Sequence, residues 1–193
     1  MNTDPATVLS ALAFCFATAS DLPYLWAVVT GRAKITTSTW LSWCITNAAI
    51  VASMYASGAI AWQIVGDTIS VAVFMLVGLY CRATTKWTRI DSLCVTIVVL
   101  AILGWYGAGD PLLATILCTA ASVVGTLPFI WNVWRRPQDQ VLSPWVMMTI
   151  GSIFGVLGIR EWDMTNALSP IVFLVLQLLI VGLVVRKYKL FLT

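Results

Sequence analysis

The sequence predicts an all-α integral membrane protein with seven transmembrane helices, arranged as two parallel three-helix repeats joined by a linker helix (3+1+3). Composition is the first reason: 60% of the 193 residues are hydrophobic, 10% are charged, and the mean hydropathy is +0.93. A soluble domain of this size needs far more polar surface. Apolar stretches of bilayer-spanning length are the second reason. The third is a phrase, LPYLWAVV from Leu22, that returns as LPFIWNVW from Leu127.

Each apolar stretch is bounded by charged, glycine or proline residues, which set the ends of the expected helices. These helices cover residues 6–29, 38–59, 62–81, 91–108, 111–134, 144–160 and 168–186. The first is preceded by Asp4 rather than by a basic segment and is longer than the apolar part of a signal peptide, so we expect a retained helix. The connections are short, so we expect residues 1–193 to form a single membrane domain.

The basic residues are divided unequally between alternate connections. Ten of the eleven fall in the first, third and fifth connections and the C-terminal segment: Arg32, Lys34, Arg82, Lys86, Arg89, Arg135, Arg136, Arg186, Lys187 and Lys189. Only Arg160 falls on the other side. The positive-inside rule therefore predicts an outside N-terminus and a cytoplasmic C-terminus, in the plasma (inner) membrane if the source is bacterial. The net charge of +3 follows from this bias and does not indicate nucleic-acid binding.

The repeated phrase belongs to a longer correspondence between the two halves of the chain. Residues 22–43 placed on 127–148 without a gap give six identities: Leu22/Leu127, Pro23/Pro128, Trp26/Trp131, Val28/Val133, Ser38/Ser143 and Trp40/Trp145. The correspondence predicts one repeat over 6–82, a linker helix over 91–108 and a second repeat over 111–187. Because the linker crosses the membrane once, the two repeats are parallel. Such repeats are a transporter architecture with the solute site between the units.

The segment LPFIWNVWRRPQDQVLSPW combines a proline-bearing helix, a basic loop and a Ser-Pro pair that opens the next helix. This pattern resembles the SWEET and PQ-loop transporter superfamily in its seven-span form. The resemblance implies hinges in helices 1, 2, 5 and 6. Pro23, Pro128 and Pro144 match three of the four hinge prolines, and Thr39 occupies the fourth position. Independently, a proline inside a helix removes one hydrogen bond and kinks it, although prolines are also common in transmembrane helices generally.

Polar residues at membrane depth are the candidate substrate-binding residues. Five are predicted for this role: Trp43, Asn47, Ser152, Gln177 and Asp67. Trp43 and Asn47 lie one turn apart on one helix face, where the indole can stack on a flat solute or hold a cation. Core packing is the alternative for Trp43. For Asp67 the alternative is a side chain that reaches the outer interface.

Asp21 lies two residues before Pro23 and near the middle of the first helix. An ionisable residue at this depth costs roughly 2.5–3.5 kcal/mol and usually faces a cavity or a partner. We predict that Asp21 carries a coupling proton. Binding of a cationic group and a hydrogen-bonded structural acid are the alternatives.

Several functional classes lack the residues they need. The chain has no histidine, and its five cysteines show no CxxC spacing, so neither a metal site nor a cofactor is predicted. No nucleophile, base and metal set lies at membrane depth, so an enzyme is not expected. The sequence therefore predicts a transporter, either a facilitator or a secondary transporter, for a small polar or aromatic solute such as a sugar, vitamin precursor or amino acid. A receptor on the same scaffold, similar to the KDEL-receptor branch, is the alternative. Whether the chain forms a homo-oligomer stays open.

Overall fold

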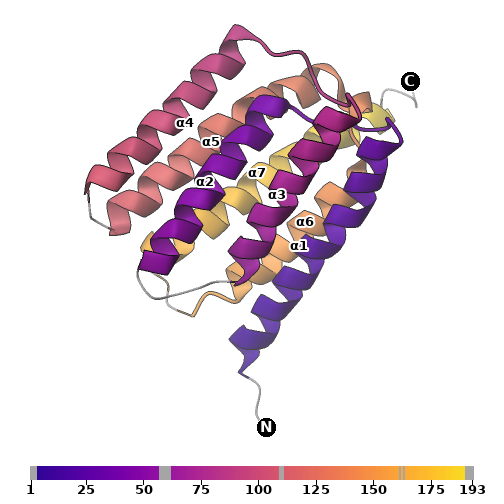
Figure 1. The fold of residues 1–193 in the computed structure, drawn as a ribbon. Helices are drawn as coiled ribbons and strands as arrows, with labels where there is room; N and C mark the ends of the chain where they lie inside the picture. The colour runs from indigo at the N-terminus through magenta and orange to yellow at the C-terminus, as the bar shows by residue number, and fades with distance from the viewer. Residues whose placement is uncertain (1–3, 57–61, 109–110, 161, 163, 190–193) are drawn as a thin grey trace.

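The computed structural model describes residues 4–56, 62–108, 111–160, 162 and 164–189. In these ranges the chain forms seven α-helices, one short 3-10 turn and no strand: α1 (Pro5–Val29), α2 (Thr37–Ala56), α3 (Trp62–Tyr80), α4 (Arg89–Ala108), α5 (Pro111–Arg135), η1 (Pro137–Asp139), α6 (Leu142–Leu157) and α7 (Met164–Lys189) (Figure 1). The prediction of an all-helical chain with seven helices is confirmed. Each helix overlaps one predicted apolar stretch, and the ends differ by a few residues.

Four helices are long and apolar enough to cross a membrane. Within the described residues these segments are Pro5–Val29, Arg89–Gly107, Thr115–Arg135 and Ala167–Arg186. Their outer surfaces carry large apolar side chains such as Leu22 in α1 and Leu103 in α4, exposed by 73% and 63%. Side chains of this kind on the outside of a bundle suit a lipid environment, so the structure agrees with the predicted membrane protein.

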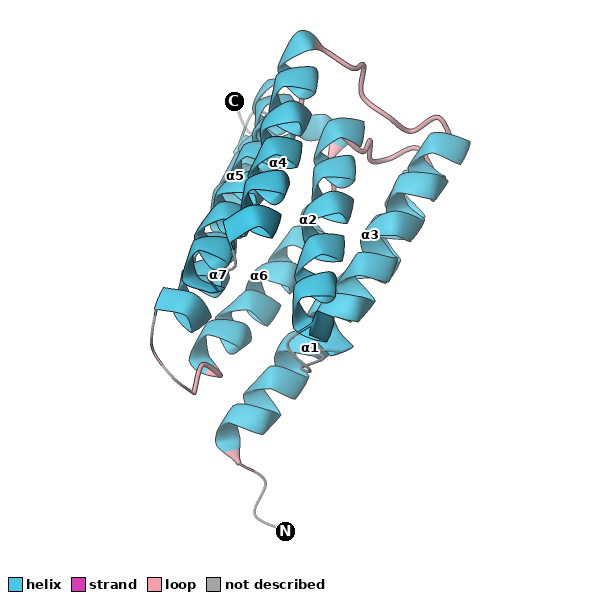
Figure 2. Ribbon diagram, turned by 60° about the vertical axis from the view of Figure 1, so that its left-hand side comes forward, coloured by secondary structure: helices cyan, strands magenta, loops and turns pink. Residues whose placement is uncertain are grey.

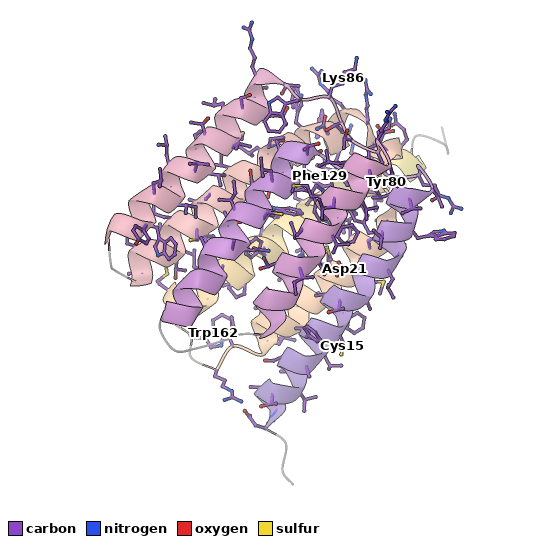
Figure 3. The ribbon with its side chains drawn as sticks, viewed as in Figure 1. Cys15, Asp21, Tyr80, Lys86, Phe129 and Trp162 are labelled. Carbon is purple, nitrogen blue, oxygen red and sulfur yellow. The ribbon has the colours of Figure 1, made fainter. Side chains whose placement is uncertain are left out.

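Three loops that hold five of the eleven basic residues meet at one end of the bundle, which we call the basic end (residues 30–36, 81–88 and 136–141). Ile35 exchanges backbone hydrogen bonds of 2.8 and 2.9 Å with Ala83 and Thr85, and the Lys34 amide donates to the Asp139 carbonyl at 3.0 Å. The Lys34 ammonium lies 3.6 Å from the Asp139 carboxylate. Figure 3 shows Lys86 and Trp162 toward opposite ends of the molecule.

At the other end of the bundle the start of α1 is tied to the connection after α6. The Arg160 guanidinium lies 2.5 Å from the Asp4 carboxylate and donates to the Thr7 hydroxyl at 2.8 Å. Asp4 also caps α1 by accepting a hydrogen bond from the Ala6 amide. Negative charge at a helix N-terminus is favourable because the first amides there lack helical partners.

The helices pack in a regular pattern (Figure 1; Figure 2). Helix α1 packs on α6, and α2 packs on α5. Helix α3 contacts both α1 and α2, α7 contacts both α5 and α6, and α4 lies against α2 and α5. Helices adjacent in the chain do not always have closely spaced backbones. Among the described residues, α1 and α2, like α5 and α6, meet through aromatic side chains but not through close backbone packing.

Two glycines allow the cross-packed helices to approach closely. A Cβ atom on Gly151 of α6 would lie 3.1 Å from the Ala13 carbonyl oxygen of α1, and one on Gly125 of α5 would lie 2.5 Å from Cβ of Ser42 in α2. Small residues at helix contacts are typical of membrane bundles, where close packing replaces the hydrophobic effect between helices.

Five buried rings form an aromatic cluster in the half of the bundle nearer the basic end: Tyr24, Trp40, Phe74, Phe129 and Trp145. Each is at most 4% exposed. Tyr24 stacks on Trp40 with ring centroids 5.7 Å apart, and Trp145 lies 5.8 Å from Tyr24 in an edge-on arrangement. These distances fall in the favourable range for aromatic pairs. The cluster joins α1, α2, α3, α5 and α6 and separates the bundle interior from the basic end.

Candidate functional site

A small cavity lies beside the aromatic cluster, on the side away from the basic end. Its volume is about 20 Å³, which is room for about one water molecule. The lining comes from three helices: Ser20, Asp21 and Tyr24 of α1, Trp40 and Trp43 of α2, and Pro144, Trp145 and Met148 of α6. Helix periodicity explains part of this set, because residues three apart share a helix face. Three such pairs line the cavity: Asp21 and Tyr24, Trp40 and Trp43, and Trp145 and Met148.

Asp21 is the only charged side chain in the lining. It is half-buried, and its Oδ2 atom accepts a hydrogen bond of 2.7 Å from the Ser70 hydroxyl of α3. No described residue donates a hydrogen bond to its other oxygen. Figure 3 shows Asp21 between the two ends of the bundle. The cavity therefore contains a carboxylate with one satisfied oxygen and no basic partner.

A second buried acid shows a different situation. Asp91 begins α4 near the basic end and is 4% exposed. One of its oxygens accepts from the Thr88 amide at 2.7 Å and from the Thr88 hydroxyl, and the other accepts from the Ser38 hydroxyl of α2. The Asp91 amide in turn donates to the Thr88 hydroxyl. This reciprocal capping box uses both oxygens, so Asp91 holds α4 to α2 and has no oxygen left for a ligand.

Two tryptophans of the lining have unused hydrogen-bond donors. The indole N–H groups of Trp40 and Trp145 are buried, and neither has an acceptor among the described residues. A buried donor without an acceptor costs about 1–3 kcal/mol and calls for an explanation. Trp43 differs, because its indole nitrogen donates to the Thr126 hydroxyl of α5 at 3.1 Å.

The lining is closed toward the basic end by a polar contact, which we call the Gln140 bridge. The Tyr24 hydroxyl donates to Oε1 of Gln140 at 3.3 Å, and Nε2 of Gln140 donates to the Lys34 carbonyl at 2.8 Å. Gln140 is 4% exposed. The phenol is therefore directed to the loops, and its proton is not available to the cavity.

Three of the residues predicted from the sequence lie around the cavity: Asp21, Trp43 and Pro144. Asn47, Ser152 and Gln177 do not line it, although Oε1 of Gln177 is buried and has no partner in the described part of the chain. Their binding role stays a prediction. Asp67 belongs to α3, but its side chain lies outside the described residues.

The three predicted hinge prolines occupy two kinds of position. Pro23 and Pro128 lie inside α1 and α5, where each removes a helical hydrogen bond. Pro144 lies in the first turn of α6, where the amide has no helical partner to lose. Each of the three precedes a ring of the aromatic cluster: Tyr24, Phe129 and Trp145. Thr39, in the fourth position, precedes Trp40 in the same way.

Sequence reasoning missed Tyr24, Trp40, Trp145 and Met148 as lining residues. The available signal was the identity of Trp40 and Trp145 at matching positions of the two halves of the sequence. Both rings are at most 4% exposed. Among the described residues no group of three His, Cys, Asp or Glu side chains is arranged to hold a metal ion.

Comparisons with known proteins found no match: no protein-family model, no curated protein and no solved structure is significantly similar to the chain.

Proposed function

We propose that this chain is a membrane transporter, either a facilitator or a proton-coupled secondary transporter, that carries a small polar or aromatic solute by alternating access between two parallel three-helix repeats. The observation that carries this proposal is the position of the cavity. Its lining combines α1 and α2 of the first repeat with α6 of the second. A site at such a junction is exposed when the two units move relative to each other.

The helix contacts support the two-repeat arrangement. Replacing α1 by α5, α2 by α6 and α3 by α7 converts every packed pair among these six helices into another packed pair. Thus α1–α6 becomes α5–α2, α1–α3 becomes α5–α7, and α2–α3 becomes α6–α7. Helix α4 has no counterpart in this exchange, as expected of a linker. A pseudo-two-fold relation between the repeats gives this pattern.

The positions of the prolines support a hinge role. Opening the cavity toward the basic end requires the rings of the aromatic cluster to separate. A proline stands directly before Tyr24, Phe129 and Trp145. Inside a helix it removes one backbone hydrogen bond, and in a first turn it fixes the backbone angle, so each ring that must move lies beside a point where the helix can bend. The structure then corresponds to a state closed at the basic end, which the positive-inside rule assigns to the cytoplasm.

The test uses purified protein reconstituted into liposomes. A thermal-shift screen against sugars, nucleosides, amino acids and vitamins identifies a stabilising solute. We expect saturable uptake of that solute. If Asp21 carries a coupling proton, Asp21→Asn abolishes uptake driven by a pH gradient and leaves solute exchange measurable.

Asp4→Asn is the matched control, because it makes the same chemical change at an exposed ion pair away from the cavity. Survival of gradient-driven uptake in Asp21→Asn contradicts the proton role. A solute that binds with high affinity but never crosses the bilayer supports the receptor alternative and contradicts transport.

A further inference from the structure

Resting on the proposed transport function, we infer that the solute is a small primary amine, and that its ammonium group occupies the cavity beside Asp21.

Charge is the first argument. Among the described residues, no group donates a hydrogen bond to the second oxygen of Asp21, and no lysine or arginine lines the cavity. The ion pairs found among the described residues, Lys34–Asp139 and Arg160–Asp4, lie at the two ends of the bundle. A carboxylate in a low-dielectric interior is stabilised by a positive group that donates hydrogen bonds to it. An ammonium group supplies both the charge and the donors.

The size of the cavity restricts the kind of ammonium. Space for about one water molecule also suits an NH₃⁺ group, which donates up to three hydrogen bonds. A trimethylated nitrogen is far larger and donates none. The cavity therefore favours a primary amine over a quaternary one.

The aromatic lining is suited to a cation. Tyr24, Trp40, Trp43 and Trp145 all contribute to the walls. Ring faces attract cations through the negative charge above the ring plane, and tryptophan is the most favourable residue for this contact. Four aromatic residues and one carboxylate around a small space form an environment typical of a bound ammonium.

Aligning the two halves of the sequence explains why one such site is expected rather than two. Thr126 stands where the repeat places Asp21, and Trp43 stands where it places Met148. Trp43 and Thr126 are joined directly by a hydrogen bond of 3.1 Å. That pair provides no charge and has used its donor. Met148, which aligns with Trp43, is flexible and has no hydrogen-bond donor, so it does not occupy the space beside Asp21 in the same way.

The experiment measures binding of four related probes to the purified full-length protein by calorimetry and thermal shift. Ethanolamine and propylamine both carry a primary ammonium group. 1-Propanol lacks the charge, and choline replaces the primary amine with a trimethylated one. We expect ethanolamine and propylamine to bind, and neither 1-propanol nor choline to bind measurably.

Two variants test the position of the ammonium group. Asp21→Asn should weaken ethanolamine binding about 10- to 100-fold, the loss expected for a hydrogen bond to a charged group. Met148→Trp keeps Asp21 but fills the cavity, so it should abolish binding while the protein stays folded. Asp4→Asn should leave binding unchanged.

The inference is overturned if no probe binds, if 1-propanol binds as well as ethanolamine, or if Asp21→Asn retains ethanolamine affinity. These outcomes are separable from failure of the transport proposal. A neutral solute that is taken up independently of Asp21 contradicts the amine and leaves transport intact. Ethanolamine that binds through Asp21 but never enters liposomes supports the site and contradicts transport.

Discussion

Two related helix junctions of this chain have different contents. At the α2–α5 junction, the Trp43 indole donates to the Thr126 hydroxyl, which itself donates to the Ser122 carbonyl at 2.6 Å. At the α1–α6 junction, the residues in the related positions are Met148 and Asp21, and both line the cavity. Trp43 borders the same cavity, so the two junctions differ in their pairs: Trp43 and Thr126 are joined by a hydrogen bond, whereas Met148 and Asp21 place a thioether beside a charge.

The difference follows from two residue exchanges. Methionine in place of tryptophan removes ring volume and an N–H donor. Aspartate in place of threonine adds a charge that has no counter-ion among the described residues. Each junction is a packed helix pair, α2 with α5 and α1 with α6. Under the two-repeat arrangement proposed above, side chains alone distinguish one junction from the other.

The largest expected effect compares truncations at the two junctions. Trp43→Ala removes a ring that contacts Trp40 at a centroid distance of 5.2 Å and also removes the donor to Thr126. We expect it to lower the free energy of unfolding by about 3–5 kcal/mol. Met148→Ala should lower it by about 2 kcal/mol, because methionine is smaller than tryptophan and donates no hydrogen bond.

Denaturant unfolding in mixed micelles measures both values. Equal losses of unfolding free energy at the two positions, or a larger loss for Met148→Ala, would contradict the expected difference between the α2–α5 and α1–α6 junctions.

An intermediate effect concerns the rings beside the two helical prolines. Tyr24 and Phe129 occupy matching positions when the two halves of the sequence are aligned. Only Tyr24 has a hydroxyl, which donates to Gln140. Gln140→Leu leaves this buried hydroxyl without its acceptor, so we expect a loss of about 1–3 kcal/mol. In the Tyr24→Phe background, which resembles the second half, the same change should cost less.

A double-mutant cycle on the free energy of unfolding gives the coupling between Tyr24 and Gln140. We expect a coupling of at least about 0.5 kcal/mol. A coupling near zero would show that the Gln140 bridge does not stabilise the closed end.

The smallest effect concerns the support of Asp21. Ser70→Ala removes its hydrogen bond of 2.7 Å, yet water in the cavity can replace the lost donor. We therefore expect a loss of about 0.5–1.5 kcal/mol and gradient-driven uptake that is reduced but present. Complete loss of uptake would assign the functional role to the pair rather than to Asp21 alone.

Much of the helical framework was predictable from the sequence. Seven apolar stretches specify seven helices because a chain in a bilayer must satisfy its backbone internally, and prolines and glycines limit their ends. Asp21 was identified as a candidate because a charge is unusual at membrane depth. Trp43 was identified because it lies one helical turn from Asn47, and Pro144 because it follows Ser143 at the start of a helix. No role was predicted for Asp91, because in the sequence an acidic residue that caps a helix looks like any other acidic residue at a helix start.

The sequence by itself determined the number and order of the helices, the unequal distribution of basic residues and the repeat offset that relates Asp21 to Thr126. These features depend on local apolarity and on comparison of the chain with itself. Only the tertiary structure decided that Met148 and Trp145 of α6 lie beside Asp21 of α1, that the Trp40 and Trp145 donors are unused, and that Tyr24 reaches Gln140. Those contacts join residues more than 100 positions apart, and they exist because α1 packs on α6 rather than on the helix that follows it in the chain.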